Sequence, residues 1–298
     1  MEPDVVAALA CPHDGAALFE GARVLGCPNG HRFDLARQGY ATLLPGRPAH
    51  GGDTPAMLDR RQRVHEAGLL AELHAAVVEA ARAGDGARER ADPQRDGTSG
   101  HGRPPGIVCE VGAGPGTYLA AVLEALPDRA GLAVDVAKAA ARRAARCHPR
   151  ASAVVADVWA GLPLHAGSVA VLLDVFAPRN AAEFARIVAP GGTLVVVTPE
   201  PRHLAELRAH FGMLDVPAGK GERVAAELTP HFLTRAVNRI DTTTLVPPGL
   251  TLDLATMGPS GHHLEPDTAG ALAAAAPGQP LEVTLAATVT RFERRHAR

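Results

Sequence analysis

The chain has 298 residues, of which 46% are hydrophobic and 3% aromatic, and its formal net charge is −2. That length supports one substantial hydrophobic core together with a small accessory module. Proteins that bind nucleic acid often carry a basic excess, because contacts to phosphates supply much of their affinity. The overall charge therefore gives no support to an RNA or DNA partner, although local basic patches remain compatible with one.

No apolar stretch approaches the roughly 20 residues that span a bilayer. The first ten residues carry Glu2 and Asp4 and do not have the form of a signal peptide. We therefore expect a cytoplasmic protein with no membrane partner. Four cysteines in such a chain do not form a disulfide framework. Cys109 is expected to be a buried strand residue, and Cys147 a packed helix residue.

Composition divides the chain into four segments. Residues 1–45 are rich in turns and contain Cys/His pairs, and residues 46–83 contain a helical pattern that begins at Thr54. Residues 84–105 have almost no apolar side chains, which predicts a flexible linker. Residues 106–298 form the main domain.

The main domain alternates short apolar segments with helical ones. Strands are predicted at 107–111, 131–135, 153–156, 169–175 and 193–198, and helices at 117–126, 136–147, 181–188, 205–211 and 223–228. This alternation is typical of an α/β fold with a parallel, doubly wound sheet. Residues 281–290 alternate in polarity, which predicts a last, antiparallel edge strand.

A glycine-rich segment, Glu110-Val-Gly-Ala-Gly-Pro-Gly116, joins the first predicted strand to the helix that follows it. Gly112, Gly114 and Gly116 would let a ligand approach the backbone closely at the start of that helix. The glycines alone do not identify the ligand, because dinucleotide-binding folds and structural turns use the same pattern.

Acidic residues at the ends of three predicted strands narrow the choice of ligand. Glu110 stands directly before the glycines, where a carboxylate can attract the ammonium group of a methionine. Asp135 ends the second strand, where an acid can accept both ribose hydroxyls. Asp157 and Val158 follow the third strand, where an adenine would lie. Together these positions favour S-adenosylmethionine over a nicotinamide cofactor.

Three further residues are candidates for the acceptor side of the site. Asp174 ends the fourth strand and is either a base or only a strand-end carboxylate. Phe176 could stack on a planar substrate or pack in the core. His203 follows the fifth strand and could border the cofactor or substrate, or serve as a cap or surface histidine.

The amino-terminal segment carries a partial zinc-binding pattern. Cys11, Cys27 and His31 supply three ligands of the kind that a tetrahedral zinc site uses, and Asp14 stands where a second cysteine of the first pair is usual. His13 is the other candidate for the fourth ligand. A module this small would gain stability from a metal. The alternative is a metal-free remnant that packs against its neighbour.

Several motifs of this chain resemble those of the bacterial 23S ribosomal RNA guanine-N1 methyltransferases, most closely the branch that confers resistance to tylosin and related macrolides in actinomycetes. They are Leu9-Ala-Cys-Pro, Cys27-Pro-Asn-Gly-His31, Gln38-Gly-Tyr40, Gly52-Asp-Thr54, Asp157-Val-Trp159, Val175-Phe-Ala-Pro-Arg-Asn180, Val197-Thr-Pro199 and Met257-Gly-Pro-Ser260. The resemblance implies a Rossmann-like class I methyltransferase with a small zinc-ribbon-like module at its amino terminus.

The resemblance also implies methylation of N1 of one guanine in a 23S RNA hairpin that lines the peptide exit tunnel. It implies that the ribbon helps to recognise RNA, and it is compatible with a homodimer that has a basic cleft. Asp174 or His262 could assist removal of the N1 proton. Arg60, Arg61 and Arg63 could contact phosphates or form an ordinary solvated face. A small-molecule methyltransferase and a non-catalytic binding protein are the competing interpretations.

Overall fold

The computed structural model of the chain describes residues 1–46, 48, 51–91, 106–258, 261 and 278–296. Its helices are α1 (Pro3–Ala8), α2 (Pro55–Glu66), α3 (Ala71–Ala91), α4 (Thr117–Ala125), α5 (Lys138–Ala144), α6 (Ala181–Ile187), α7 (Ala205–Phe211), α8 (Lys220–Leu228) and α9 (Pro248–Thr256). Its strands are β1 (Phe19–Gly21), β2 (Val24–Gly26), β3 (Arg32–Asp34), β4 (Tyr40–Thr42), β5 (Ile107–Val111), β6 (Gly131–Asp135), β7 (Ala151–Val155), β8 (Val169–Val175), β9 (Val188–Pro199), β10 (Phe232–Val246) and β11 (Leu281–Arg294).

A mixed sheet with strand order β10-β11-β9-β8-β5-β6-β7-β4 forms the centre of the fold. The strands from β9 to β4 in that order run parallel, and β11 pairs antiparallel with both β9 and β10. The predicted parallel, doubly wound sheet is confirmed, because every strand predicted from residue 107 onward lies in it.

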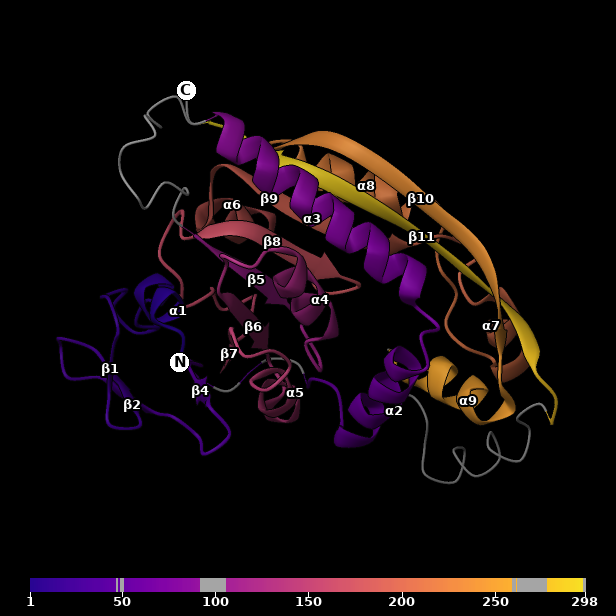
Figure 1. Ribbon diagram of the computed structural model, residues 1–298, viewed down its shortest axis with the longest axis horizontal. Coiled ribbons are helices and arrows are strands. Elements are labelled where there is room, and N and C mark those ends of the chain that lie inside the picture. Colours follow the sequence, from indigo (N-terminus) through magenta and orange to yellow (C-terminus); the bar gives the residue numbers. More distant parts are fainter. Residues whose placement is uncertain (47, 49–50, 92–105, 259–260, 262–277, 297–298) are drawn as a thin grey trace.

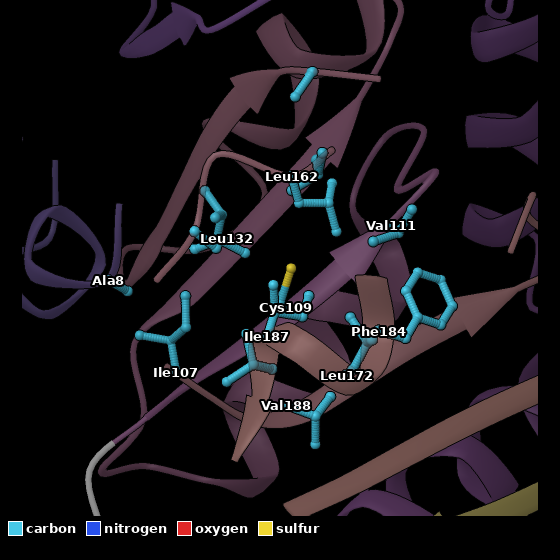
Figure 2. Packing of buried hydrophobic residues seen from close by; sticks show 14 of the residues in the cluster. Ala8, Ile107, Cys109, Val111, Leu132, Leu162, Leu172, Phe184, Ile187 and Val188 are labelled. Carbon is cyan, nitrogen blue, oxygen red and sulfur yellow. The ribbon is translucent and has the colours of Figure 1, made fainter. Parts of the chain in front are cut away.

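Helices cover both faces of the sheet, and alternate residues of each strand point to one face or the other. On one face, α3, α4 and α5 pack over Val108 and its neighbours. On the other face, α1, α6 and α8 contribute to the cluster around Cys109, Leu172 and Phe184, part of which is shown in Figure 2. The prediction that Cys109 is a buried strand residue is confirmed.

The helical region predicted at 54–83 consists of two helices rather than one. Thr54 caps α2 as predicted, because its Oγ1 accepts a hydrogen bond of 3.3 Å from the Met57 N–H, and Pro55 occupies the first turn. The chain then turns, and α3 runs back along β9 and β11, as Figure 1 shows. α2 instead lies beside α9, at the end of the sheet.

The predicted linker at 84–105 is wrong in its first part, because α3 continues to Ala91. Gly84 lies against β9 so closely that a Cβ atom there would clash with Thr193 Oγ1. Asp85 is buried and forms an ion pair of 2.7 Å with Arg129, which is also buried. The polar composition suggested exposure, but the glycine permits close packing and the acid has a buried partner. Residues 92–105 lie outside the described residues.

The carboxyl-terminal part of the fold holds the largest departure from the predicted elements. The strand predicted at 281–290 is antiparallel as expected, but it extends to Arg294 and is not the edge. β10 pairs with it from Phe232 to Val246 and forms the edge instead. The sequence does not predict β10 or α9. Most side chains of β10 are exposed or half-buried, so the strand lacks a clear alternation of apolar and polar residues.

The amino-terminal module contains α1 and the small antiparallel sheet β1-β2-β3. It does not end as a separate unit at residue 45, because β4 pairs in parallel with β7 at the edge of the large sheet. Leu18 and Leu25 belong to the same buried cluster as the sheet residues. The module is therefore continuous with the core of the main domain. Across the described part of the chain, none of the helices combines the length and the apolar character that crossing a membrane requires.

Candidate cofactor site and metal centre

A cavity of about 620 Å³ lies at the carboxyl ends of the parallel strands. Its walls come from the loops that follow β5 to β9, and also from residues 51–53, α2 and the end of α9. Open α/β sheets bind their ligands at this edge. The cavity brings together most of the predicted site residues, namely Glu110, Gly112, Asp135, Asp157, Val158, Phe176 and His203.

Glu110, near the end of β5, is buried at the inner end of this cavity. Its Oε2 accepts a hydrogen bond of 3.0 Å from the Leu119 N–H in the first turn of α4. Gly116 begins that helix without a capping side chain, so the carboxylate takes over part of the capping role. Burial raises the pKa of Glu110 to about 8, and the charge of Arg61 acts in the opposite direction. A bound ammonium group would stabilise the ionised carboxylate.

The glycines of the loop after β5 permit close packing around the cavity. Gly112 has a φ of +64°, and a Cβ atom there would lie 2.7 Å from the Cβ of Ala177 in the loop after β8. A Cβ atom on Gly116 would lie 2.9 Å from Cys147 Sγ. Cys147 is half-buried and packs beside the start of α4 as predicted, but it lies after the end of α5 and not within that helix. Gly112 lines the cavity, whereas Gly114 and Gly116 shape the loop behind it.

Backbone N–H groups hold the next two carboxylates in place. Asp135, at the end of β6, accepts hydrogen bonds of 2.9 Å from Gly114 N and 2.8 Å from Ala137 N. Burial raises the pKa of Asp135, and these two hydrogen bonds lower it. Asp157, after β7, accepts a bond of 2.9 Å from Trp159 N. Both carboxylates therefore lie at consecutive strand ends, as a bound nucleoside requires.

Phe176 and His203 form the outer part of the cavity. Phe176 has a φ of +54° and is 40% exposed, and its ring centroid lies 5.6 Å from that of His203. A left-handed backbone at a phenylalanine costs about 1–3 kcal/mol and is typical of functional sites. Burial lowers the pKa of His203 to about 4, and its Nδ1 has no hydrogen-bond partner among the described residues. This geometry favours ligand contact over core packing or a surface position.

Asp174 does not line the cavity, although the sequence made it a candidate base. It is buried at the end of β8, where Oδ1 accepts a hydrogen bond of 3.2 Å from Ala177 N and Oδ2 pairs with Arg179 Nη1 at 3.2 Å. Burial raises the pKa of Asp174 to about 7, while Arg179 opposes that shift. These contacts favour the strand-end alternative, in which the carboxylate shapes its loop. His262 lies outside the described residues and stays a prediction.

Arg61 is a site residue that sequence reasoning assigned to the wrong surface. It lines the cavity, where its Nη2 contacts Asp53 Oδ2 at 2.6 Å and donates to the Met257 carbonyl oxygen at 2.7 Å. The signal was present in the sequence, because Arg61 lies on the same helical face as the buried Met57 and Val64.

The neighbouring arginines also have protein partners. Arg63 makes two hydrogen bonds to the Asp253 carboxylate, of 2.6 Å and 2.7 Å, and Arg60 approaches the same carboxylate at 3.9 Å. The Arg63 guanidinium therefore joins α2 to α9. The expectation that the arginines of this helix form one phosphate-binding or solvated face does not describe their arrangement.

A buried aromatic cluster beside the cavity was also missed. His65 Nδ1 and His74 Nε2 are 2.9 Å apart, and the Tyr118 ring stacks on His74 with centroids 4.1 Å apart. Burial lowers the pKa of both histidines, that of His65 to about 3, so both are neutral at physiological pH. His65 and Tyr118 line the cavity. Burial raises the pKa of the Tyr118 hydroxyl, and the nearby charge of Glu110 raises it further. No spacing in the sequence indicates this cluster, because its members come from three helices.

The predicted metal ligands Cys11, Asp14, Cys27 and His31 lie together, with their ligand atoms all within 4.8 Å of one another. Cys11 Sγ is 3.5 Å from His31 Nδ1, and Asp14 Oδ2 is 3.3 Å from Cys27 Sγ and 3.2 Å from His31 Nδ1. Ligands around a tetrahedral zinc ion are roughly 3.3–3.8 Å apart for its usual bond lengths. Sulfur, nitrogen and carboxylate donors at these separations fit zinc.

Asp14, rather than His13, is the fourth member of this set. The His13 ring lies outside this set, between the rings of His31 and Phe33, with centroids 4.8 Å and 5.9 Å away. Hydrogen bonds from the Asn29 side chain and the Ala16 backbone hold the pKa of Asp14 well below its usual range, so its carboxylate is ionised. An ionised carboxylate can replace a thiolate as a zinc ligand.

The parallel sheet, the acid-lined cavity at its carboxyl edge and the antiparallel strand beside β9 define an S-adenosylmethionine-dependent methyltransferase of class I, joined here to a zinc ribbon. The family model of the RlmA amino-terminal zinc ribbon matches residues 9–50.

Three relatives cover most of the chain. A protein of Streptomyces fradiae, described as a 23S rRNA (guanine(748)-N(1))-methyltransferase, is 43% identical over 97% of this chain and 98% of its own. A protein of Micromonospora griseorubida, described as a 23S rRNA guanine-N1 methyltransferase, is 43% identical over 98% of this chain and 99% of its own. One of Bacillus subtilis with the same description is 30% identical over 69% of this chain and 68% of its own. The chain belongs to the family of 23S rRNA guanine-N1 methyltransferases.

Proposed function

We propose that the protein transfers a methyl group from S-adenosylmethionine to N1 of a guanine in a 23S rRNA hairpin that lines the peptide exit tunnel. The expected target is the guanine equivalent to the one named for the Streptomyces fradiae relative, number 748. Such methylation would act in the cytoplasm and confer resistance to tylosin and related macrolides. The observation that carries the proposal is 43% identity to that relative over 97% of the chain.

The outer part of the cavity suits a planar base. Phe176 and Trp159 line it and are 40% and 55% exposed. A guanine in a hairpin must leave its stack before a protein can reach N1, and aromatic rings replace the lost stacking. We assign Phe176 to the target guanine and Trp159 to that base or its neighbour.

The zinc ribbon offers exposed arginines to an RNA backbone, although residues 1–45 are not basic overall, because their three arginines stand beside five acids, Glu2, Asp4, Asp14, Glu20 and Asp34. Arg23, Arg32 and Arg37 of residues 1–45 are exposed. Arginine contacts to phosphates give affinity without sequence information, so they would position the hairpin rather than select the base. We propose that the ribbon binds the RNA backbone while the cavity holds the target guanine.

When bound, S-adenosylmethionine supplies an electrophilic methyl group on a sulfonium. The residues of the chain must place guanine N1 in line with that group at near-attack distance. N1 carries a proton at neutral pH, and this proton passes to solvent water or to a candidate base such as His262 as the new carbon–nitrogen bond forms. Because Asp174 does not line the cavity and its carboxylate is engaged by Ala177 N and Arg179, we do not assign the proton to it. His203, neutral and beside Phe176, is assigned to the boundary between cofactor and base.

Mapping the methylated nucleotide tests the proposal. Large-subunit RNA from a macrolide-sensitive strain is incubated with the protein and labelled S-adenosylmethionine, and primer extension then locates the modification. N1 methylation blocks base pairing, so a stop beside guanine 748 is expected. Phe176→Ala should lower the rate about five- to 150-fold, because base stacking contributes about 1–3 kcal/mol. Val237→Ala, an exposed apolar residue on β10, is the matched control.

Two outcomes would overturn the RNA assignment. Label that appears on a macrolide or another metabolite, with none in the RNA, would make the protein a small-molecule methyltransferase. Binding of S-adenosylmethionine without transfer to any RNA would make it a non-catalytic relative. A stop at another guanine would keep the reaction and correct the target.

A further inference from the structure

The inner end of the cavity carries charges of both signs. Glu110 and Asp135 are acidic, and the charge of Arg61 lowers the pKa of both carboxyl groups. The other arginine and lysine side chains among the described cavity residues serve elsewhere. Arg208 donates to the His203 carbonyl oxygen at 2.6 Å, and Lys220 interacts with the groups around Asp174. Arg61 is therefore the cation that accompanies the acids at this end.

Two segments that lie far apart in the chain hold the Arg61 guanidinium. Its Nη2 contacts Asp53, from the Gly52-Asp53-Thr54 motif, at 2.6 Å. The same Nη2 donates to the carbonyl oxygen of Met257, 196 residues away, at 2.7 Å. Both motifs lie outside the glycine loop and the strand-end acids that mark the cofactor site. Their shared contact with Arg61 gives them a common role, which is to fix one guanidinium in the cavity.

The other edge of the guanidinium faces the glycine loop. A Cβ atom on Gly114 would lie 2.7 Å from Arg61 Nη1, so this nitrogen lies directly against the backbone of the loop. In Glu110 and Arg61 the inner end of the cavity thus presents one buried carboxylate and one oriented guanidinium. An amino acid carries one ammonium and one carboxylate group, which is the complementary charge pair. Guanidinium groups bind carboxylates with strong, oriented hydrogen bonds.

We propose that Arg61 binds the carboxylate of the amino-acid end of S-adenosylmethionine, while Glu110 binds the ammonium group of the same end. Asp53 and the Met257 carbonyl oxygen position the guanidinium for this contact. The inference rests on the cofactor assignment and is independent of which RNA base accepts the methyl group.

Decarboxylated S-adenosylmethionine tests this assignment, because it keeps the ammonium and sulfonium groups and lacks only the carboxylate. Titration calorimetry would measure the dissociation constants of both compounds for the wild type and for Arg61→Gln. The substitution should weaken S-adenosylmethionine about ten- to a hundredfold, as expected for a hydrogen bond between charged groups. It should change the affinity for the decarboxylated compound less than about threefold, which is the size of effect expected when a substitution removes no contact to the ligand.

Two control variants make the test specific. Arg60→Gln, one position earlier on α2 and outside the cavity, should leave both dissociation constants unchanged. Arg61→Lys keeps the charge and should recover part of the preference for S-adenosylmethionine. The wild type should itself prefer S-adenosylmethionine over the decarboxylated compound by about the factor that Arg61→Gln loses, so the proposal can be tested even if the variant does not fold.

Equal losses for the two compounds in Arg61→Gln would show that Arg61 only supports the shape of the cavity, and would overturn the proposal. Equal affinity of the wild type for both compounds would overturn it without any variant. Failure of the wild type to bind S-adenosylmethionine would refute the cofactor assignment itself. Normal binding together with no methylation of RNA would leave this proposal standing and refute the proposed function.

Discussion

The metal centre and the cofactor cavity are built in opposite ways. The metal centre takes its ligands from two neighbouring turns, and the bond between Cys11 and His31 spans 20 residues. The cavity joins α2 to the end of α9 through a contact between Arg61 and Met257 that spans 196 residues. A local site is visible as a spacing in the sequence, whereas a site assembled by the fold is visible only in part.

The two sites also differ in what stabilises them. The ribbon sheet has only short strands, so metal binding can contribute much of the folding free energy of the module. The cavity lies on a sheet with extensive cores on both faces, which can tolerate buried carboxylates such as Glu110 and Asp135. The following predictions, from the largest expected effect to the smallest, test whether the ribbon and the cavity can be destabilised independently of each other.

Removal of zinc should separate the two sites most clearly. Cys27→Ser, or treatment with a chelator, should unfold the ribbon, because structural zinc contributes about 10–16 kcal/mol in small zinc domains. Methylation of RNA should then fall at least about a hundredfold, because a ribbon that has lost this folding free energy no longer binds the RNA. Binding of S-adenosylhomocysteine should persist. Native mass spectrometry, a methylation assay and calorimetry would measure the three quantities.

Two further variants control the zinc experiment. Asp34→Asn, an exposed acid of the ribbon outside the ligand set, should retain the metal. Asp14→Cys should hold zinc more tightly against a chelator, because a thiolate is a softer ligand than a carboxylate. Loss of S-adenosylhomocysteine binding in step with zinc would contradict the separation, and would mean that the core shared by the ribbon and the sheet couples the two sites.

Gly112→Ala should lower the free energy of unfolding by about 2–4 kcal/mol, because the new side chain would combine a left-handed backbone with a steric clash. The new Cβ atom would lie 2.7 Å from that of Ala177. Gly212→Ala is the matched control: its φ is +62°, but nothing lies within 4 Å of the added atom. It should cost only about 1 kcal/mol. Urea unfolding would measure both, and equal losses would argue against close packing at Gly112.

Gly84→Ala should destabilise the protein by about 1–3 kcal/mol through overpacking against β9. In a free helix the same change would stabilise by up to about 1 kcal/mol, so the sign of the effect separates a packed helix from a linker. Thr193→Ala removes both side-chain atoms that the new methyl group would meet first. The double variant should therefore be more stable than the sum of the single changes implies. Additive effects would contradict the contact.

Glu110 should make the ligand-free protein less stable as the pH rises. Its pKa is about 8 in the folded chain, against an ordinary value of 4.5, so between these pH values the folded state holds a proton that the unfolded state has lost. The resulting stability is complete below pH 4.5 and disappears as the pH rises through 8. Between pH 6.5 and 8.5 the loss should be about 1–2 kcal/mol.

Glu110→Gln should flatten this pH dependence, because glutamine does not titrate. The wild type and the variant would be compared by urea unfolding at several pH values without ligand. His65 and His203 have lowered pKa values of about 3 and about 4, so their contributions change mainly below this window. Asp174, with a raised pKa of about 7, adds a smaller decline that both proteins keep. An equally steep decline in both proteins would assign the effect to other groups.

Sequence patterns alone were sufficient for the parallel sheet, the glycine loop and the strand-end acids. Glu110, Asp135 and Asp157 follow apolar strands directly, and parallel strands must bring such residues to one edge. The cluster of four candidate metal ligands was likewise predictable, because their chemistry and spacing are local. The extension of α3 past Gly84 was not, because its polar residues conceal a buried ion pair between Asp85 and Arg129.

Only the tertiary structure decided the roles of residues whose partners lie far away in the chain. Asp174 became a loop anchor because Arg179 and Ala177 N engage its carboxylate. Arg61 became a cavity residue because Asp53 and Met257 meet around its guanidinium. Side-chain type and spacing determine what a residue can do. The long-range packing of the sheet and its helices determines which neighbour it meets, and no local pattern records that packing.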